Sequence, residues 1–271
     1  MAAEVVSLRR AIVARRTPLL AQVEMQRAAM EARDAASGWT ASDSSLVKLY
    51  YTQLLQALGR RLKVQQPAVC TAIVYFRRLY CRCSLHEHDP LLMAPTALWM
   101  ACKVEECMIT AGSVVREMRG LRDETYEVAQ LLDAEYVLLE NLAFELIVVH
   151  PFEPLRHLLR AVASAGLGDA EHERQGSLVQ AAWGLLNDCY RTDVVVCHPP
   201  DALALACVHV AGTLMAIPTH QWFPPGEELV CAALWDLYDR CTRLGPRELT
   251  TLDERLRAHW SAARPGGKGL G

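Results

Sequence analysis

The sequence of 271 residues lacks the features that would place a protein in a membrane or on nucleic acid. No apolar run approaches the roughly 20 residues that a helix needs to span a bilayer. The chain also lacks a basic excess: its formal net charge is −3, whereas binding to a phosphate backbone depends on many Lys and Arg contacts. We therefore expect a soluble protein with neither membrane contact nor direct nucleic-acid binding.

Sequence patterns of catalysis and cofactor binding are missing as well. No arrangement of Ser, His and Asp suggests a nucleophile with its base, and the Gly-rich end has neither the spacing of a phosphate-binding loop nor a preceding strand. The ten cysteines are scattered rather than concentrated in a short secreted framework, which favours free thiols in a reduced compartment. We expect no enzyme activity, no cofactor and no small-molecule substrate.

Apolar residues instead recur at spacings of three and four along most of the chain, without convincing period-two segments. This spacing predicts an all-α protein. Breakers and polar stretches divide the chain into an N-terminal helix and linker at residues 1–45 and a flexible tail at 263–271. Between them we assign two helical units, 46–150 and 151–262.

An internal echo supports the assignment of two units. The pattern P-x-A-L-x-x-A-C occurs at residues 95–102 and again at 200–207, which is 105 residues later. Both copies are rich in small residues and apolar on all sides, as is typical of a central helix that its neighbours approach closely. The echo indicates two similar helical units, each of about 100 residues, a normal domain size.

Two charges stand out in the first unit because they interrupt apolar helical segments. Lys103 is the first charge after the apolar run 94–102, and Glu135 falls in the middle of an apolar stripe within 128–142. A carboxylate in such a place is rare unless it is paired, and Lys103 is the expected partner. Two interpretations remain open: an internal salt bridge, or a donor and an acceptor offered to another chain's backbone.

A resemblance to the cyclin family is carried by six segments in order: YFRRLY, DPLLMAPTALWMACKVEE, AEYVLLENLAFELIVVHP, NDCYRTD, HPPDALALACVHVA and QWF. They cover about residues 46–240 and are most similar to the cyclin C group, the partners of the Mediator-associated cyclin-dependent kinase. The resemblance implies two tandem five-helix cyclin boxes preceded by an N-terminal helix. It also implies a nuclear regulatory subunit that binds a cyclin-dependent kinase and other subunits of the Mediator kinase module.

The resemblance further implies which residues bind the kinase. In the family, the Lys of the KVEE-type motif and the Glu matching Glu135 hold the kinase main chain beside its C-helix, which assigns this role to Lys103 and Glu135, with Glu106 of the same motif beside them. Such a pair supplies only part of the roughly 5.5 kcal/mol that moves a population from 1:99 to 99:1, since hydrogen bonds to charged groups contribute about 1.5–3 kcal/mol. We therefore expect exposed apolar side chains nearby and choose Phe144 and Leu146.

Two departures from the cell-cycle cyclins favour the transcription-linked group. An Arg and Asp pair that ties the first two helices of the box in those cyclins is replaced by two cations, Lys48 and Arg77, which cannot form that bridge. Their substrate-docking patch is replaced by VKLYY and Leu54. We therefore do not expect substrates to dock at this patch.

The second unit contains a segment, WGLLNDCYRTD, that predicts a second interface. It places four side chains along one helical flank: Trp183, Asn187, Asp188 and Arg191. An aromatic ring beside amide and charged groups is typical of an interface, and the set resembles the groove through which cyclin C binds another Mediator subunit, with Tyr238 closing it from a later helix. The alternative is a core Trp with solvated polar neighbours.

The segment CRCSLHEHD holds four potential zinc ligands: Cys81, Cys83, His86 and His88. A C-x-C followed by H-x-H on so short a loop is poorly suited to tetrahedral coordination, so we expect a helix end with incidental thiols and no metal.

Three alternatives to the Mediator kinase activator remain: another transcriptional cyclin, a core transcription factor whose two cyclin boxes bind DNA, and a metal-dependent or otherwise catalytic helical protein.

Overall fold

The structure is a computed structural model of the chain. It describes residues 28, 32–35, 38–122, 126–164, 169–217, 228–243 and 246–263. These residues form helices joined by turns, with no strand among them, so the all-α prediction is confirmed. Most of the predicted N-terminal helix and nearly all of the predicted tail lie outside the described residues. None of the described helices combines the length and the hydrophobicity that crossing a membrane requires.

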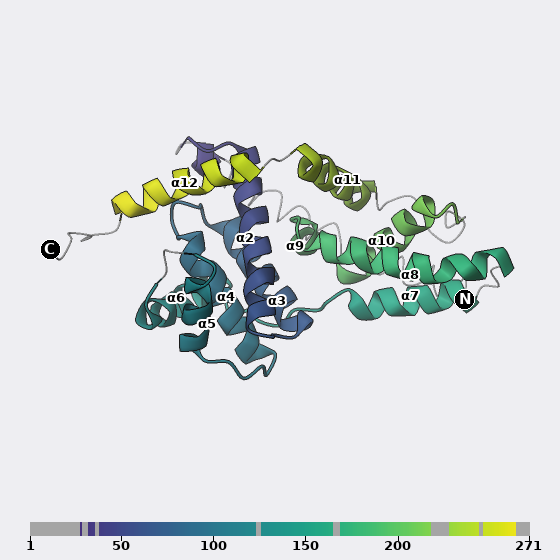
Figure 1. Ribbon diagram of the computed structural model, residues 1–271, viewed down its shortest axis with the longest axis horizontal. Coiled ribbons are helices and arrows are strands. Elements are labelled where there is room, and N and C mark those ends of the chain that lie inside the picture. The colour runs from purple at the N-terminus through teal and green to yellow at the C-terminus, as the bar shows by residue number, and fades with distance from the viewer. Residues whose placement is uncertain are drawn as a thin grey trace. The chain divides into compact units, whose positions relative to one another are not determined.

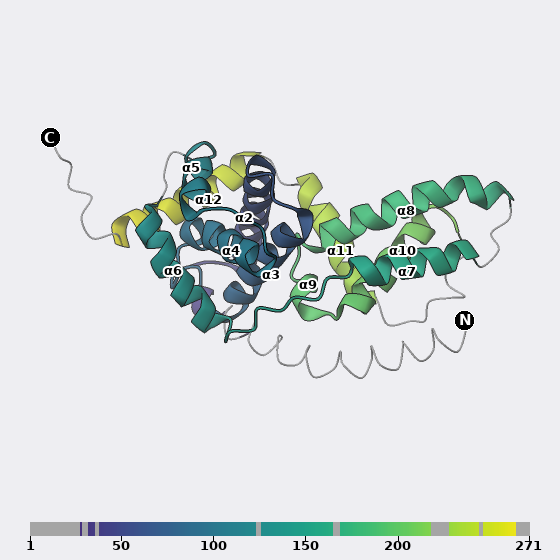
Figure 2. The same ribbon diagram turned by 90° about the horizontal axis from the view of Figure 1, so that it is seen from below.

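The described chain folds into two compact units. The first unit contains α2 (Ala41–Arg61), α3 (Gln66–Arg82), α4 (Pro90–Val104), α5 (Ala111–Arg119), α6 (Val128–Asn141) and α12 (Pro246–Ala263). Figures 1 and 2 show α4 at the centre of this unit, where it contacts α2, α3, α5 and α6.

The central position of α4 follows from its sequence. The helix begins at Pro90, which needs no backbone donor at this position, and the Asp89 carboxylate accepts from the Leu91 amide at 2.9 Å. Nearly every side chain from there to Cys102 is buried, because small and apolar residues allow neighbouring helices to approach on all sides. Lys103, in the last turn, is therefore the first charge that the helix presents to solvent.

The helix α3 is tied to α2 through a buried cation. Arg77 is only 2% exposed, and its Nη2 donates to the Thr52 hydroxyl at 3.1 Å. That hydroxyl in turn donates to the Lys48 carbonyl at 2.8 Å. The Thr52 hydroxyl therefore connects Arg77 of α3 to the Lys48 backbone of α2.

The helix α12 packs on the first unit, although residues 246–262 were predicted to belong to the second. The Arg255 guanidinium lies 3.4 Å from the Asp43 carboxylate and 4.6 Å from the centre of the Trp39 ring. The ring nitrogens of His259 and His86 are 3.0 Å apart. An amphipathic helix buries its apolar stripe wherever a complementary face exists, so the stripe alone did not identify which unit it covers.

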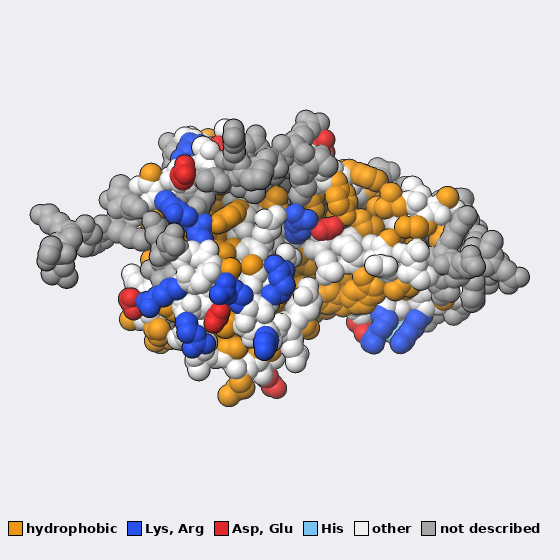
Figure 3. Space-filling model, in the orientation of Figure 1, with side chains coloured by type: hydrophobic (Ala, Val, Ile, Leu, Met, Phe, Trp, Pro, Cys, Tyr) orange, Lys and Arg blue, Asp and Glu red, His pale blue; other side chains and the backbone are white. Residues whose placement is uncertain are grey.

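Basic side chains gather over α2 and α5, as Figure 3 shows. The last turns of these helices carry Arg60 and Arg61, and Arg116 and Arg119. Cations are favoured at helix C-termini, where carbonyl groups without helical partners concentrate negative charge. Arg61 and Arg116 also share the Glu117 carboxylate, at 3.1 and 3.5 Å. Helix stability therefore accounts for these cations.

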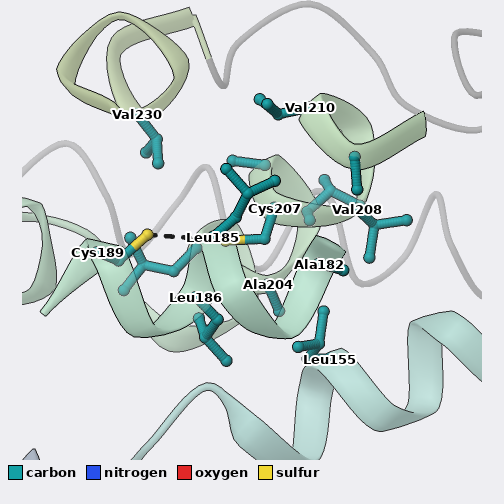
Figure 4. Packing of buried hydrophobic residues seen from close by; sticks show 14 of the residues in the cluster. Leu155, Ala182, Leu185, Leu186, Cys189, Ala204, Cys207, Val208, Val210 and Val230 are labelled. Carbon is teal, nitrogen blue, oxygen red and sulfur yellow. Dashed lines mark hydrogen bonds between the residues drawn. The ribbon is translucent and has the colours of Figure 1, made fainter. Parts of the chain in front are cut away.

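The second unit is built around a central helix of its own. It contains α7 (Phe152–Ser164), α8 (Asp169–Cys189), α9 (Val194–Cys197), α10 (Pro200–Leu214) and α11 (Glu228–Arg243, as far as Arg240). The helix α10 contacts α7, α8 and α9. Figure 4 shows its buried core, where the sulfur atoms of Cys189 and Cys207 lie 3.6 Å apart among aliphatic side chains.

The central helices α4 and α10 correspond, but not in the register of the sequence echo. Both contain 15 residues and begin with a proline, Pro90 and Pro200, which lie 110 residues apart. In this register Trp99 and His209 are the partly exposed residues of otherwise buried stretches. The echo at 105 residues aligns Pro95, inside α4, with the first residue of α10. Ala and Leu recur in both helices, so the repeated sequence pattern aligned residues that differ by five positions from those that correspond in the structure.

Candidate functional site

The predicted pair of Lys103 and Glu135 forms at the surface of the first unit. The Lys103 ammonium donates to Glu135 Oε1 and lies 3.9 Å from the centre of the Trp99 ring. The side chains of Lys103 and Glu135 are 44% and 17% exposed. Partial burial lowers the pKa of the Lys103 ammonium. The pair is thus an internal salt bridge that is also open to solvent.

Glu135 lies beside the buried face of α6 and not in its middle. The buried residues of this helix are Leu131, Ala134 and Leu138. Leu132, a member of the predicted apolar stripe, is 41% exposed. Counting Leu132 moved the centre of the predicted stripe toward Glu135. The true buried face lies to one side of Glu135, so its carboxylate is less deeply buried than the pattern suggested.

The turn after α4 separates the two glutamates of the KVEE motif. The Thr71 hydroxyl donates to the Glu105 carboxylate at 2.6 Å, which directs that side chain toward α3. Glu106 is exposed and adopts a left-handed φ of 56°, while the Cys107 amide donates to the Cys102 carbonyl at 2.7 Å. This is the hydrogen-bond pattern of a Schellman motif. Glu106 therefore lies on the same accessible end of α4 as Lys103.

The segment after α6 exposes one of the two predicted apolar side chains. Phe144 is 68% exposed at a left-handed φ of 59°. Leu146 is only partly exposed, and its carbonyl accepts a hydrogen bond from the Tyr75 hydroxyl at 2.5 Å. Ile147, which the sequence analysis did not choose, is 85% exposed. Other exposed apolar side chains of this unit are Val104, Met108, Leu132 and Tyr136.

In the second unit, three of the five predicted groove residues meet. The Tyr238 hydroxyl donates to the Asp188 carboxylate at 2.7 Å, and Arg191 donates to the same carboxylate at 3.2 Å. Burial and the Asp188 charge raise the pKa of Tyr238, so its hydroxyl remains a donor. Trp235, one helical turn before Tyr238 on α11, is exposed, and its spacing from Tyr238 was the signal that could have found it.

Trp183 packs against the core of the second unit while remaining partly exposed. Its ring stacks on Phe152 with centroids 5.6 Å apart, and Phe152 stacks on Tyr190 in turn. Asn187, one turn later on α8, is also partly exposed. Trp183 therefore contacts the core through its stack on Phe152 and is still partly accessible, while its place in an interface stays a prediction.

Two of the four potential zinc ligands, Cys83 and His86, contact side chains outside the set. The Cys83 thiol lies 2.9 Å from the Asn141 side-chain oxygen, and burial raises its pKa to about 11. His86 contacts His259, and Cys81 is buried. Among the described residues, no three His, Cys, Asp or Glu side chains are placed to hold a metal ion.

Comparisons with known proteins place these features in a family. The model of the cyclin N-terminal domain matches residues 38–147. Cyclin-C1-1 of Oryza sativa subsp. japonica is 39% identical over 200 residues, which are 72% of this chain and 72% of that protein. Cyclin-C of Rattus norvegicus is 38% identical over 65% of this chain and 64% of that protein.

A solved structure shares the fold at lower identity. A chain in the structure of the CAK complex from Chaetomium thermophilum bound to ATP-gamma-S superposes with a TM-score of 0.65 and is 21% identical. The match covers 92% of the present chain and 84% of that chain. At this identity the likeness concerns the helical architecture.

Proposed function

The chain belongs to the cyclin family, and on this basis we propose that it binds and activates a transcription-linked cyclin-dependent kinase, the one associated with Mediator. As a cyclin, the chain is a regulatory subunit and not an enzyme. Its similarity to proteins named cyclin C supports the choice of kinase. The same similarity supports a nuclear role.

The proposed mechanism is a population shift in the kinase. A kinase is active when a Glu of its C-helix pairs with the Lys that holds the ATP phosphates. A cyclin that binds only the inward position of that helix increases the population of the active state. The shift cannot exceed the difference in affinity for the two states, so the cyclin surface must supply several kcal/mol of selective contact.

The observation that carries the proposal is the accessible pair of Lys103 and Glu135. An ammonium has three donors and a carboxylate has about four acceptor positions, and their mutual bond uses one of each. The remaining capacity suits the carbonyl and amide groups of a partner's main chain. The exposed Glu106 adds a second carboxylate at the end of α4.

Apolar contact supplies the remainder of the binding energy. Burying a large apolar side chain contributes about 1.5–3 kcal/mol. Phe144, Ile147 and Tyr136 are exposed in the same unit as the charged pair. Two or three such contacts, with one charge-assisted hydrogen bond, reach the roughly 5.5 kcal/mol of a full population shift.

The test measures binding of the purified Mediator-associated kinase together with thermal unfolding. We expect Lys103→Ala and Glu135→Ala to weaken binding about ten- to a hundredfold, the range for one hydrogen bond to a charged group. Arg119→Ala is the matched control, since it removes another ion pair of the first unit, to Glu127 at 3.1 Å. A wild-type chain that fails to bind the kinase, or variants whose loss of binding only follows their loss of stability, would refute the proposal.

We assign the second surface, around Asp188, Arg191 and Tyr238, to another subunit of the Mediator kinase module. A carboxylate held by a Tyr and an Arg, with the exposed Trp235 ring against that Tyr, has the composition of an interface hot spot. The alternative, a core transcription factor that binds DNA, predicts a mobility shift of promoter DNA that weakens steeply with salt.

A further inference from the structure

One face of α3 carries a row of polar side chains that the proposed function does not use. Thr71, Tyr75, Arg78 and Arg82 are spaced by four, three and four residues, which places them on one side of the helix. We call this row the α3 stripe. Each member donates a hydrogen bond to one of the two segments that carry the proposed kinase surface.

The first of these segments is the turn after α4. Thr71 is fully buried, and its hydroxyl donates to the Glu105 carboxylate at 2.6 Å. Glu105 lies between Lys103 and Glu106, so the bond fixes the residue that separates the two exposed charges. The direction of the Glu106 side chain depends on this turn.

The second segment is residues 141–147, which comprise the last residue of α6 and the turn and irregular stretch after it. Arg82 donates to the Asn141 carbonyl at 2.7 Å, and Arg78 donates to the Glu145 carbonyl at 3.1 Å. Tyr75 donates to the Leu146 carbonyl at 2.5 Å. Three backbone carbonyls of the segment therefore bond to side chains of one helix, which substitute for the regular partners that an irregular segment lacks.

The stripe is rigid because Thr71 and Tyr75 are buried in the first unit and the two arginines are partly buried. Tyr75 has no exposed surface, and burial together with the Glu105 charge raises its pKa to about 12, so its hydroxyl remains a donor at physiological pH. Arg78 is partly buried, and this burial lowers the pKa of its guanidinium. The donors are thus held in place before any partner arrives.

We propose that Thr71, Tyr75, Arg78 and Arg82 are positioning residues for kinase binding, which hold the turn at Glu105 and the segment 141–147 in the arrangement that the kinase contacts. The inference rests on the proposed function. When a binding-competent arrangement is only partly populated, the apparent dissociation constant increases in inverse proportion to its population. The α3 stripe keeps that population high, so Phe144 and Ile147 need no ordering on binding.

The test compares two tyrosines of the same helix. Tyr75→Phe removes the hydroxyl that binds the Leu146 carbonyl, while Tyr80→Phe removes a hydroxyl that binds the His88 carbonyl at 2.7 Å, outside both segments. Both rings are buried and retained in the variants. The two variants should therefore lose similar stability, and only Tyr75→Phe should affect kinase binding.

Three measurements separate positioning from direct contact. For Tyr75→Phe we expect faster hydrogen exchange of the amides of 143–146 and a two- to tenfold larger dissociation constant, the range for one neutral hydrogen bond. Kinase turnover at saturating cyclin should stay unchanged, because the hydroxyl does not touch the kinase. Arg82→Lys, which keeps a donor, should bind better than Arg82→Met.

The outcomes also separate this inference from the proposed function. If the wild-type chain binds the kinase and Tyr75→Phe binds as tightly as wild type or as Tyr80→Phe, the positioning role is refuted and the proposed function stands. The same holds if exchange in 143–146 accelerates without any change in affinity. If the wild-type chain binds no such kinase, the proposed function fails and the positioning role fails with it.

Discussion

Glu106 offers a substitution for which fold stability and kinase binding should change in opposite directions. Its φ of 56° is left-handed, a conformation that costs a non-glycine residue roughly 1 kcal/mol. Glu106→Gly removes that strain, but glycine loses more freedom on folding, so the expected net gain in the free energy of unfolding is about 0.5 kcal/mol. For a unit of this size the melting temperature should rise by roughly 2 °C.

The same substitution removes an exposed carboxylate from the proposed kinase surface. An exposed ion pair contributes at most about 1 kcal/mol, so binding should weaken by up to about fivefold. Differential scanning calorimetry measures the stability, and titration with the purified kinase measures the affinity. A drop in the free energy of unfolding of Glu106→Gly would refute the assignment of strain at this turn.

Two controls distinguish the backbone effect from the charge effect. Glu106→Ala removes the carboxylate and keeps a residue with a side chain at the left-handed position, so it should weaken binding without the gain in stability. Ala216, two residues after the end of α10, has a φ of 53° and is exposed, so Ala216→Gly should stabilise the second unit and leave kinase binding unchanged. Equal changes in all three variants would contradict the reasoning.

Three further predictions concern the rest of the molecule. Arg255→Ala should lower the free energy of unfolding of the first unit by about 1–2 kcal/mol, because it removes an ion pair to Asp43 and a cation–π contact, and urea unfolding measures the loss. Burial, the neighbouring His259 and Arg255 lower the pKa of His86, so on acidification the unfolded chain takes up a proton before the folded chain does. The contribution of His86 to the free energy of unfolding should be fully present above about pH 6.5 and fall on acidification. His86→Gln should flatten this dependence in urea titrations at several pH values. Trp183→Ala should leave kinase affinity unchanged and weaken assembly with other kinase-module subunits in a pull-down, and a parallel loss of both would contradict a separate second surface.

The central helices and the charged pair could be predicted from the sequence because each follows from an unusual composition within a single segment. An apolar run with no polar side must be surrounded by other helices, and α4 is. A carboxylate on an apolar helix needs a cation, and Lys103 was the expected partner because it is the first charge after the other apolar run. Both arguments need only the properties of single segments, which a sequence displays directly.

The remaining features depend on contacts between distant segments. Phe144 and Ile147 are exposed, while the Leu146 carbonyl is bound by Tyr75. Which side chains are exposed follows from the left-handed backbone at residues 143 and 144, which the sequence does not predict. The α3 stripe was not predicted because its partners are backbone carbonyls, which every residue has. Only the folded chain shows which carbonyls need a donor.

The packing of α12 on α2 has a consequence for biosynthesis. The ribosome makes Cys241–Gly271 after Val148–Arg240, although α12, from the later stretch, packs with helices made much earlier. The nascent first unit therefore lacks its final helix until the intervening unit has been made. Translation that stops within α11 would leave Trp39 and Asp43 without Arg255, and the unit that bears the proposed kinase surface would be unfinished.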